Sequence, residues 1–184
     1  SYQIITDSCA DLTDVQLKQW DVSCVNLTLR YNGENHSNFS DPAAVKAFYD
    51  EMRNGTMATT AAANPEEWAA VMRAALDAGR DVLVITFSSG MSTTYQSAVI
   101  ASQDLQGEYP DRTILVVDSL CAALGQGLLV YHACRKRDEG MDIRELAAWV
   151  EEHRLNLCHW VTVDDLAHLK RGGRISSTSA LVGS

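Results

Sequence analysis

The sequence has 184 residues, of which 46% are hydrophobic and 21% charged, and its formal net charge at pH 7 is −9. This composition allows a substantial core and argues against disorder, while the acidity argues against binding to nucleic acid or to anionic membrane surfaces. The five cysteines form no Cys-x-x-Cys pair, which disfavours a zinc site or dithiol chemistry and favours a reducing, cytoplasmic compartment. The apolar runs are shorter than a membrane span requires, so no stable membrane insertion is expected.

The first predicted element is a short strand over Gln3–Asp7, which ends in the polar turn Ser8–Asp11. A capped helix is expected next, over residues 13–20. A dinucleotide site at this first turn would need glycines that let a pyrophosphate approach the backbone, and the turn contains none. Asp7 and Ser8 could line a binding site or could only satisfy backbone groups, and the residues leave both interpretations open.

The next segment predicts a strand, a hairpin turn and a helix. Polar and apolar residues alternate over Ser23–Tyr31, which predicts one half-exposed strand. Asn32-Gly33 then predicts a tight hairpin turn. A helix is expected over Pro42–Arg53, with Asp41 before the proline at its first position.

A small-residue segment, Ala61–Ala63, separates Thr60 from the next helix. Asn64 as the cap, Pro65 at the first helical position and two glutamates in the first turn predict a helix to about Ala78. The three alanines could be extended and let a ligand approach closely, or they could form a tolerant linker.

Val82–Phe87 is an unbroken apolar run rich in β-branched residues, which predicts a strand buried on both faces. The hydroxyl-rich loop Ser88–Thr94 follows, and then a helix over Tyr95–Gln106, for which Ser92 or Thr93 can serve as N-cap. Free backbone N–H groups at a helix N-terminus favour anions, so this loop is interpreted as the binding loop. A capped helix with nothing bound is the alternative.

Another short strand is predicted over Thr113–Val117, ending in Asp118 and Ser119, and a helix over Leu120–Arg137 follows. The small residues near the start of that helix are Ala122, Ala123, Gly125 and Gly127. Their face permits close packing of a neighbouring element or of an apolar ligand. A further helix is expected over residues 142–155.

Strands and helices that alternate from residue 82 to 155 predict a parallel sheet flanked by helices, and thus an α/β fold. Ligands in such sheets bind beyond the carboxyl ends of the strands. Three polar turns follow strands, at Asp7-Ser8, Ser88-Ser89 and Asp118-Ser119. Their convergence at one edge of the sheet predicts a binding site there.

The last stretch predicts a strand start at Val161, a short helix and the turn Lys170–Arg174. Gly172 and Gly173 permit a sharp turn, and Arg174 presents a guanidinium that suits a carboxylate or a phosphate. A solvent-exposed helix end whose basic residues offset the helix dipole is the alternative.

Four segments together resemble the signatures of the DegV family, in order and spacing along nearly the whole chain. They are Ile5–Leu12, Ser88–Ala98, Val117–Ser119 and Leu169–Ser176, with Thr93 where glycine is commoner. The resemblance implies a bacterial fatty-acid-binding protein without catalytic residues, cofactor or metal of its own. Such a protein buries the acyl chain between two lobes and presents the carboxylate to a separate fatty acid kinase subunit, which makes the acyl phosphate.

Residue roles follow from this resemblance. Thr60 would hold the carboxylate, although the serine and proline that follow this threonine in the family are replaced here by alanines. Ser92 would share the task, with Ser88 and Ser89 as alternates beside Gly90, and Arg174 would lie near the same network. Residues that could line the pocket are Asp7, Ser8, Ala61, Ala62, Asp118, Ser119, Ala122 and Ala123.

The resemblance also implies a division of the chain. Residues 1–158 would form a DegV-like N-terminal α/β lobe, and residues 159–184 the beginning of a second α+β lobe that continues beyond this sequence. The carboxylate-proximal histidine of the family would lie in that missing part, since none of the five histidines here matches it.

Two other functions remain open. A sugar-phosphate-binding enzyme or module could use the same Ser/Thr-rich loop, and a purely structural partner module would bind no small molecule. A serine hydrolase is disfavoured because no Gly-x-Ser-x-Gly stands around Ser88–Ser92.

Overall fold

A computed structural model describes residues 1–37, 41–163 and 165–176. Its main sheet, sheet A, holds four parallel strands in the order β2-β1-β6-β7. These strands are β1 (Tyr2–Asp7), β2 (Val22–Val25), β6 (Asp81–Thr86) and β7 (Ile114–Asp118). Residues 82–86 of β6 are all buried, which confirms the prediction of a strand covered on both faces.

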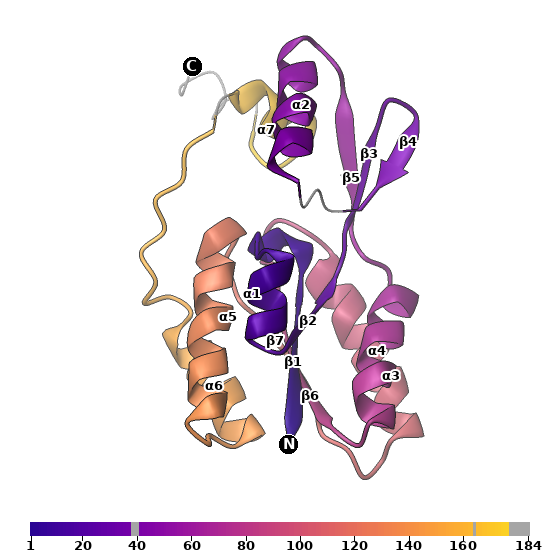
Figure 1. Ribbon diagram of the computed structural model, residues 1–184, viewed down its shortest axis with the longest axis vertical. Coiled ribbons are helices and arrows are strands. Elements are labelled where there is room, and N and C mark those ends of the chain that lie inside the picture. The colour runs from indigo at the N-terminus through magenta and orange to yellow at the C-terminus, as the bar shows by residue number, and fades with distance from the viewer. Residues whose placement is uncertain (38–40, 164, 177–184) are drawn as a thin grey trace.

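Helices cover both faces of sheet A (Figure 1). On one face lie α1 (Asp14–Gln19), α5 (Ala123–Asp138) and α6 (Ile143–His153), and on the other α3 (Pro65–Asp77) and α4 (Thr94–Glu108). Alternate strand residues point to opposite faces, so Ile4 joins the core under α5 and α6 while Ile5 joins the core under α3 and α4. The predicted α/β fold with a parallel sheet between helices is confirmed.

The predicted helix starts are confirmed where a side chain caps them. Thr13, Asn64 and Asp142 each accept the N–H of a residue in the first turn, and each forms a reciprocal capping box. Asp41 caps α2 (Pro42–Arg53) in the same way, by accepting the N–H of Ala44.

A second, antiparallel sheet, sheet B, stands apart from sheet A. Its strands are β3 (Thr28–Tyr31), β4 (Glu34–His36) and β5 (Ala58–Ala61), in the order β4-β3-β5. The Asn32-Gly33 turn joins β3 to β4, as predicted. Figure 1 shows this sheet with α2 and α7 (Leu166–Arg171) above the carboxyl edge of sheet A. The ring of Tyr31 lies 5.0 Å from that of Phe48 on α2.

The prediction of one strand over Ser23–Tyr31 is wrong, because this segment crosses from one sheet to the other. β2 ends at Val25 in sheet A and β3 begins at Thr28 in sheet B. Between them the N–H of Leu27 donates to Ser8 Oγ at 3.0 Å, and Ser8 begins the 3-10 turn η1 (Ser8–Ala10). Polar–apolar alternation continues through the crossing, so the pattern does not reveal it.

Strand β5 was not predicted, and two boundaries differ from the predictions. β5 includes Ala61, so the first of the three alanines is extended. Helix α5 begins at Ala123 rather than Leu120, because Leu120 has left-handed backbone, with a φ of 53°, which a right-handed helix does not accommodate. Residues 161–163 form no strand.

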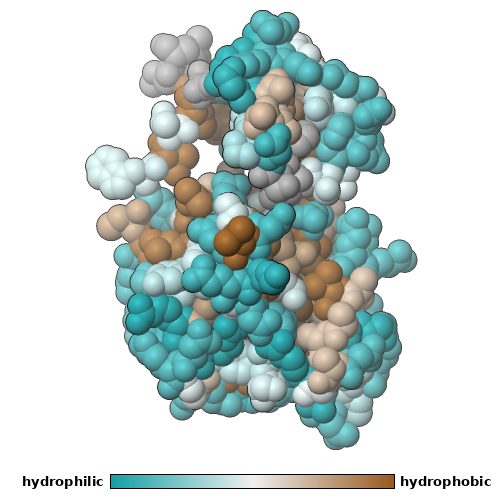
Figure 2. Space-filling model, viewed as in Figure 1, coloured by the Kyte–Doolittle hydropathy of each residue, from teal (hydrophilic) through white to brown (hydrophobic). Residues whose placement is uncertain are grey.

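The segment between α6 and α7 carries exposed apolar side chains. Leu155, Trp160 and Val161 are 74%, 96% and 76% exposed, and Figure 2 shows apolar atoms gathered along this side of the molecule. The lobe boundary expected at residue 158 falls in this segment and stays a prediction. Within the described ranges, no helix has the length and apolar character needed to cross a membrane.

Gly127 gives a direct test of how α5 packs. A Cβ built on Gly127 would lie 2.6 Å from the backbone carbonyl oxygen of Ala10, and a backbone atom cannot move away cheaply. Gly127→Ala is therefore expected to lower the free energy of unfolding by about 1–3 kcal/mol, measured by chemical denaturation.

Gly107 supplies the matched control, because it is also helical but a Cβ there meets nothing within 4 Å. Gly107→Ala should leave stability unchanged or raise it by up to about 1 kcal/mol. Equal effects of the two substitutions would contradict the close approach of α5 to η1.

Candidate functional site

The carboxylate of Asp7 joins three segments at the carboxyl edge of sheet A. Its Oδ2 accepts the N–H of Phe87 at 2.6 Å, and its Oδ1 accepts the N–H of Cys9 at 3.0 Å. The side-chain amide of Gln126 on α5 donates to the same Oδ1 at 3.2 Å. Asp7 is fully buried, so its contacts give it a role inside the protein rather than at an open surface.

Burial raises the pKa of Asp7 from 3.8 to about 6, although its hydrogen bonds from Phe87, Gln126 and Cys9 oppose the shift. The same amide of Gln126 donates to Thr6 Oγ1 at 3.0 Å, and Thr6 in turn donates to the carbonyl of Ile85 at 2.8 Å. Gln126 is fully buried, and its Oε1 has no hydrogen-bond partner among the described residues.

A second carboxylate, that of Asp118 at the end of β7, also accepts backbone N–H groups at this edge. Its Oδ1 accepts the N–H groups of Ser89 and Leu120, each at 3.1 Å. Its backbone carbonyl accepts Arg154 Nη1 at 2.6 Å. Ser119 is fully buried, and its Oγ accepts the N–H of Cys121 at 3.0 Å. The three polar turns therefore meet at one edge, as predicted, and two aspartates connect them.

The loop after β6 is closed by its own hydrogen bonds. Every backbone N–H from residue 87 to residue 92 donates within the protein. The acceptors are Asp7 Oδ2, the carbonyl of Cys121, Asp118 Oδ1, Ser88 Oγ and, for the last two donors, the carbonyl of Ser88. None of these six N–H groups is free to bind a ligand. The expectation of free N–H groups at the N-terminus of α4, which begins at Thr94, stays a prediction.

Side-chain hydroxyls are the polar groups that this loop offers. Ser88 is buried, whereas Ser89 and Gly90 are exposed and Ser92 is half-buried. Thr93 occupies the N-cap position of α4, but its side chain makes no capping bond. Instead Ser92 Oγ accepts the N–H of Thr94 at 3.2 Å.

Thr60 lies at the end of sheet B nearest this edge. Thr60 on β5 pairs with Leu29 on β3. Four residues before Leu29, Val25 on β2 pairs with Asp7 in sheet A. Four residues span at most about 14 Å, so Leu29, the strand partner of Thr60, lies within that distance of Val25. Contact of Thr60 with a ligand at the carboxyl edge stays a prediction. Thr60 and Ala61 are exposed, and Ala62 is half-buried.

The remaining predicted residues lie in two other places. Ala122 is half-buried and Ala123 exposed at the start of α5. Arg174 follows α7, where its Nη1 donates to the carbonyl of Gly172 at 2.5 Å. That bond lies within its own turn, so the approach of Arg174 to the carboxyl edge stays a prediction.

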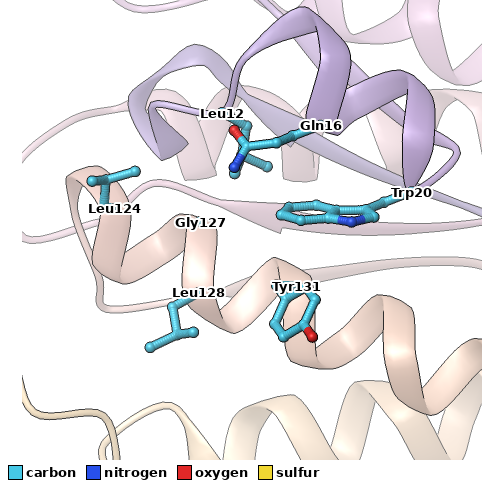
Figure 3. A pocket seen from close by; sticks show the side chains of 7 residues that line it. All are labelled: Leu12, Gln16, Trp20, Leu124, Gly127, Leu128 and Tyr131. Carbon is cyan, nitrogen blue, oxygen red and sulfur yellow. The ribbon is translucent and has the colours of Figure 1, made fainter.

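A shallow apolar depression of about 320 Å³ lies between α1 and α5 (Figure 3). It is lined by Leu12, Gln16, Trp20, Leu124, Gly127, Leu128 and Tyr131. The rings of Trp20 and Tyr131 lie 5.1 Å apart along it. Gly127 approaches the backbone at Ala10, so close packing of η1 against α5 explains this small residue.

Two members of the network were missed by sequence reasoning. Gln126 lies in α5 between Leu124 and the run Leu128–Val130, and a glutamine in such an apolar stretch is the signal that could have revealed a buried partner. Arg154 sits at the end of α6 and carries no comparable signal. In the described part of the chain, no three His, Cys, Asp or Glu side chains are grouped to hold a metal ion.

Comparison with known proteins identifies this arrangement. The model of the DegV family, described as uncharacterised proteins, matches residues 1–184. The chain belongs to the DegV family. A DegV domain-containing protein of Clostridium perfringens is 42% identical over 184 residues, which are 100% of this chain and 63% of that protein. The chain thus spans less than two thirds of this DegV relative.

Two solved DegV-like structures cover the whole chain and 64% of their own lengths. A DegV family protein from Thermus thermophilus, described by its fatty acid binding, has a TM-score of 0.84 and 32% sequence identity. A stearic-acid-binding protein from Eubacterium ventriosum has a TM-score of 0.84 and 25% identity. The likeness includes both sheets, since all of this chain is covered.

The raised pKa of Asp7 predicts how stability depends on pH. The folded protein holds the Asp7 proton up to about pH 6, whereas the unfolded chain releases it near 3.8. Stability from the neutral carboxyl is therefore present at low pH and is lost as pH rises through 6. Between pH 5 and pH 8 the loss should be on the order of 1 kcal/mol.

Asp7→Asn removes this titration. The difference in unfolding free energy between the parent and Asp7→Asn should change by that amount from pH 5 to pH 8, as measured by urea denaturation at each pH. A difference that is constant over this range would show that Asp7 is not a buried carboxyl of raised pKa.

Proposed function

We propose that the full-length protein binds a long-chain fatty acid and holds its carboxylate at the carboxyl edge of sheet A. The observation that carries the proposal is the match of the entire chain to two structures of fatty-acid-binding proteins at 32% and 25% identity. Thr60 and Ser92 hold the carboxylate in this proposal, with Ser88 and Ser89 as alternates beside Gly90.

The comparisons support a carboxylate rather than a phosphate. The backbone N–H groups of residues 87–92, which precede α4, already donate within the protein, whereas the first turn of α4, which begins at Thr94, could serve either anion. A carboxylate has two oxygens and can be held by a few hydroxyls. The two similar structures are those of fatty-acid-binding proteins, which favours the fatty acid over the sugar phosphate.

The site supplies position rather than chemistry in this proposal. In the described part of the chain, the hydrogen-bond partner of the Ser92 hydroxyl is Thr94, which is not a base. In this proposal a separate fatty acid kinase receives the presented carboxylate and makes the acyl phosphate. The acyl chain is buried between the lobe described here and the second lobe, and Arg174 lies near the carboxylate once that lobe is in place.

Removal of the Thr60 hydroxyl tests the carboxylate contact. Thr60→Val keeps the shape of the side chain and removes one donor, and a hydrogen bond to a charged group contributes about 1.5–3 kcal/mol. Oleate affinity of the full-length protein should therefore fall by roughly 10- to 100-fold. Titration of the delipidated protein with oleate measures it, and thermal unfolding should change little because Thr60 is exposed.

Thr59→Val is the matched control. Thr59 is the preceding residue of β5, is also exposed and points to the opposite face of sheet B. Its substitution should leave oleate affinity unchanged. Parent-like affinity of Thr60→Val would remove Thr60 from the site, and Ala61–Ala63 would then be the first segment to re-examine.

A further inference from the structure

The hydroxyls of Ser92 and Thr94 form a hydrogen-bonded pair at the start of α4. Their oxygens are 2.7 Å apart, and either atom could be the donor on distance alone. Ser92 Oγ also accepts the backbone N–H of Thr94 at 3.2 Å. Burial decides which hydroxyl donates to the other.

Thr94 is fully buried, whereas Ser92 is half-buried. A buried hydroxyl must donate its proton to an acceptor, since an unpaired polar group in the interior is costly. In the described ranges of the chain, Ser92 Oγ is the acceptor that Thr94 Oγ1 reaches. Thr94 therefore donates, and Ser92 accepts.

This direction fixes what Ser92 can still do. Its oxygen accepts both the hydroxyl and the N–H of Thr94, which uses the two lone pairs of a serine oxygen. What remains is the proton of Ser92 itself, on a side chain that is partly open to solvent. Ser92 is thus a donor toward any ligand and cannot accept from one.

We propose that Thr94 is a positioning residue that fixes Ser92 as a hydrogen-bond donor toward the ligand carboxylate. The inference rests on the proposed function, in which Ser92 contacts that carboxylate. A donor-only hydroxyl selects an ionised carboxylate over a ligand group that must itself donate, such as an ammonium. Thr94 acts only through Ser92 and does not touch the ligand.

Oleate titration of full-length variants tests this role. Thr94→Val keeps the shape of the side chain and removes the donor, so Ser92 regains rotational freedom and can turn its proton away from the ligand. Oleate affinity should fall by roughly three- to tenfold. Thr94→Ser restores the hydroxyl and should return the affinity to within about twofold of the parent.

A double-mutant cycle separates positioning from general damage to the loop. In the Ser92→Ala background, Thr94→Val should cause no further loss of affinity, because the group that it orients is gone. Thermal unfolding is measured on each variant, and Thr94→Ala takes the place of Thr94→Val if that variant does not fold.

Two results overturn the inference alone. These are an unchanged oleate affinity in Thr94→Val, and an equal loss from Thr94→Val with and without Ser92. In both cases oleate binding by the parent leaves the proposed function standing. A parent protein that binds no oleate overturns the proposed function and the inference together.

Discussion

The buried carboxylate of Asp7 is the interaction on which the arrangement of the site depends. One side chain at the end of β1 accepts N–H groups from η1 and from the loop after β6, and it also receives the amide of Gln126. These donors come from three parts of the chain that are far apart in sequence. An ionised carboxylate in the interior is costly unless hydrogen bonds surround it. Here those hydrogen bonds come from three segments, and they therefore also hold the three segments together.

As a consequence, the backbone N–H groups of residues 87–92 all donate within the protein. Asp7 and Asp118 accept the N–H groups of Phe87 and Ser89, and the remaining donors up to residue 92 bond within the loop or to Cys121. Within residues 87–92 the groups left to contact an anion are hydroxyls, and a few hydroxyls can hold a carboxylate. In sheet B, Thr60 pairs with Leu29, which follows Val25 of this edge by four residues.

Much of the fold could be predicted because its signals are local. The apolar run Val82–Phe87 identifies the central strand, and Asn64 with its glutamate identifies a helix start. The crossing within Ser23–Tyr31 could not be predicted, because alternation is the same in one strand or in two. Nor could the partnership of Gln126 with Asp7, since the two residues lie 119 positions apart. The convergence of the turns was predictable from parallel topology, but the use of their N–H groups depends on side-chain directions that only the structure gives.

The central claim is that this protein carries a fatty acid, and mass spectrometry of the full-length protein tests it most directly. The protein would be purified from bacterial cells without detergent, denatured and extracted with organic solvent, and the extract compared with that of a protein that binds no lipid. The account predicts one long-chain fatty acid per protein molecule. Extraction that recovers a sugar phosphate, or no small molecule at all, would contradict it.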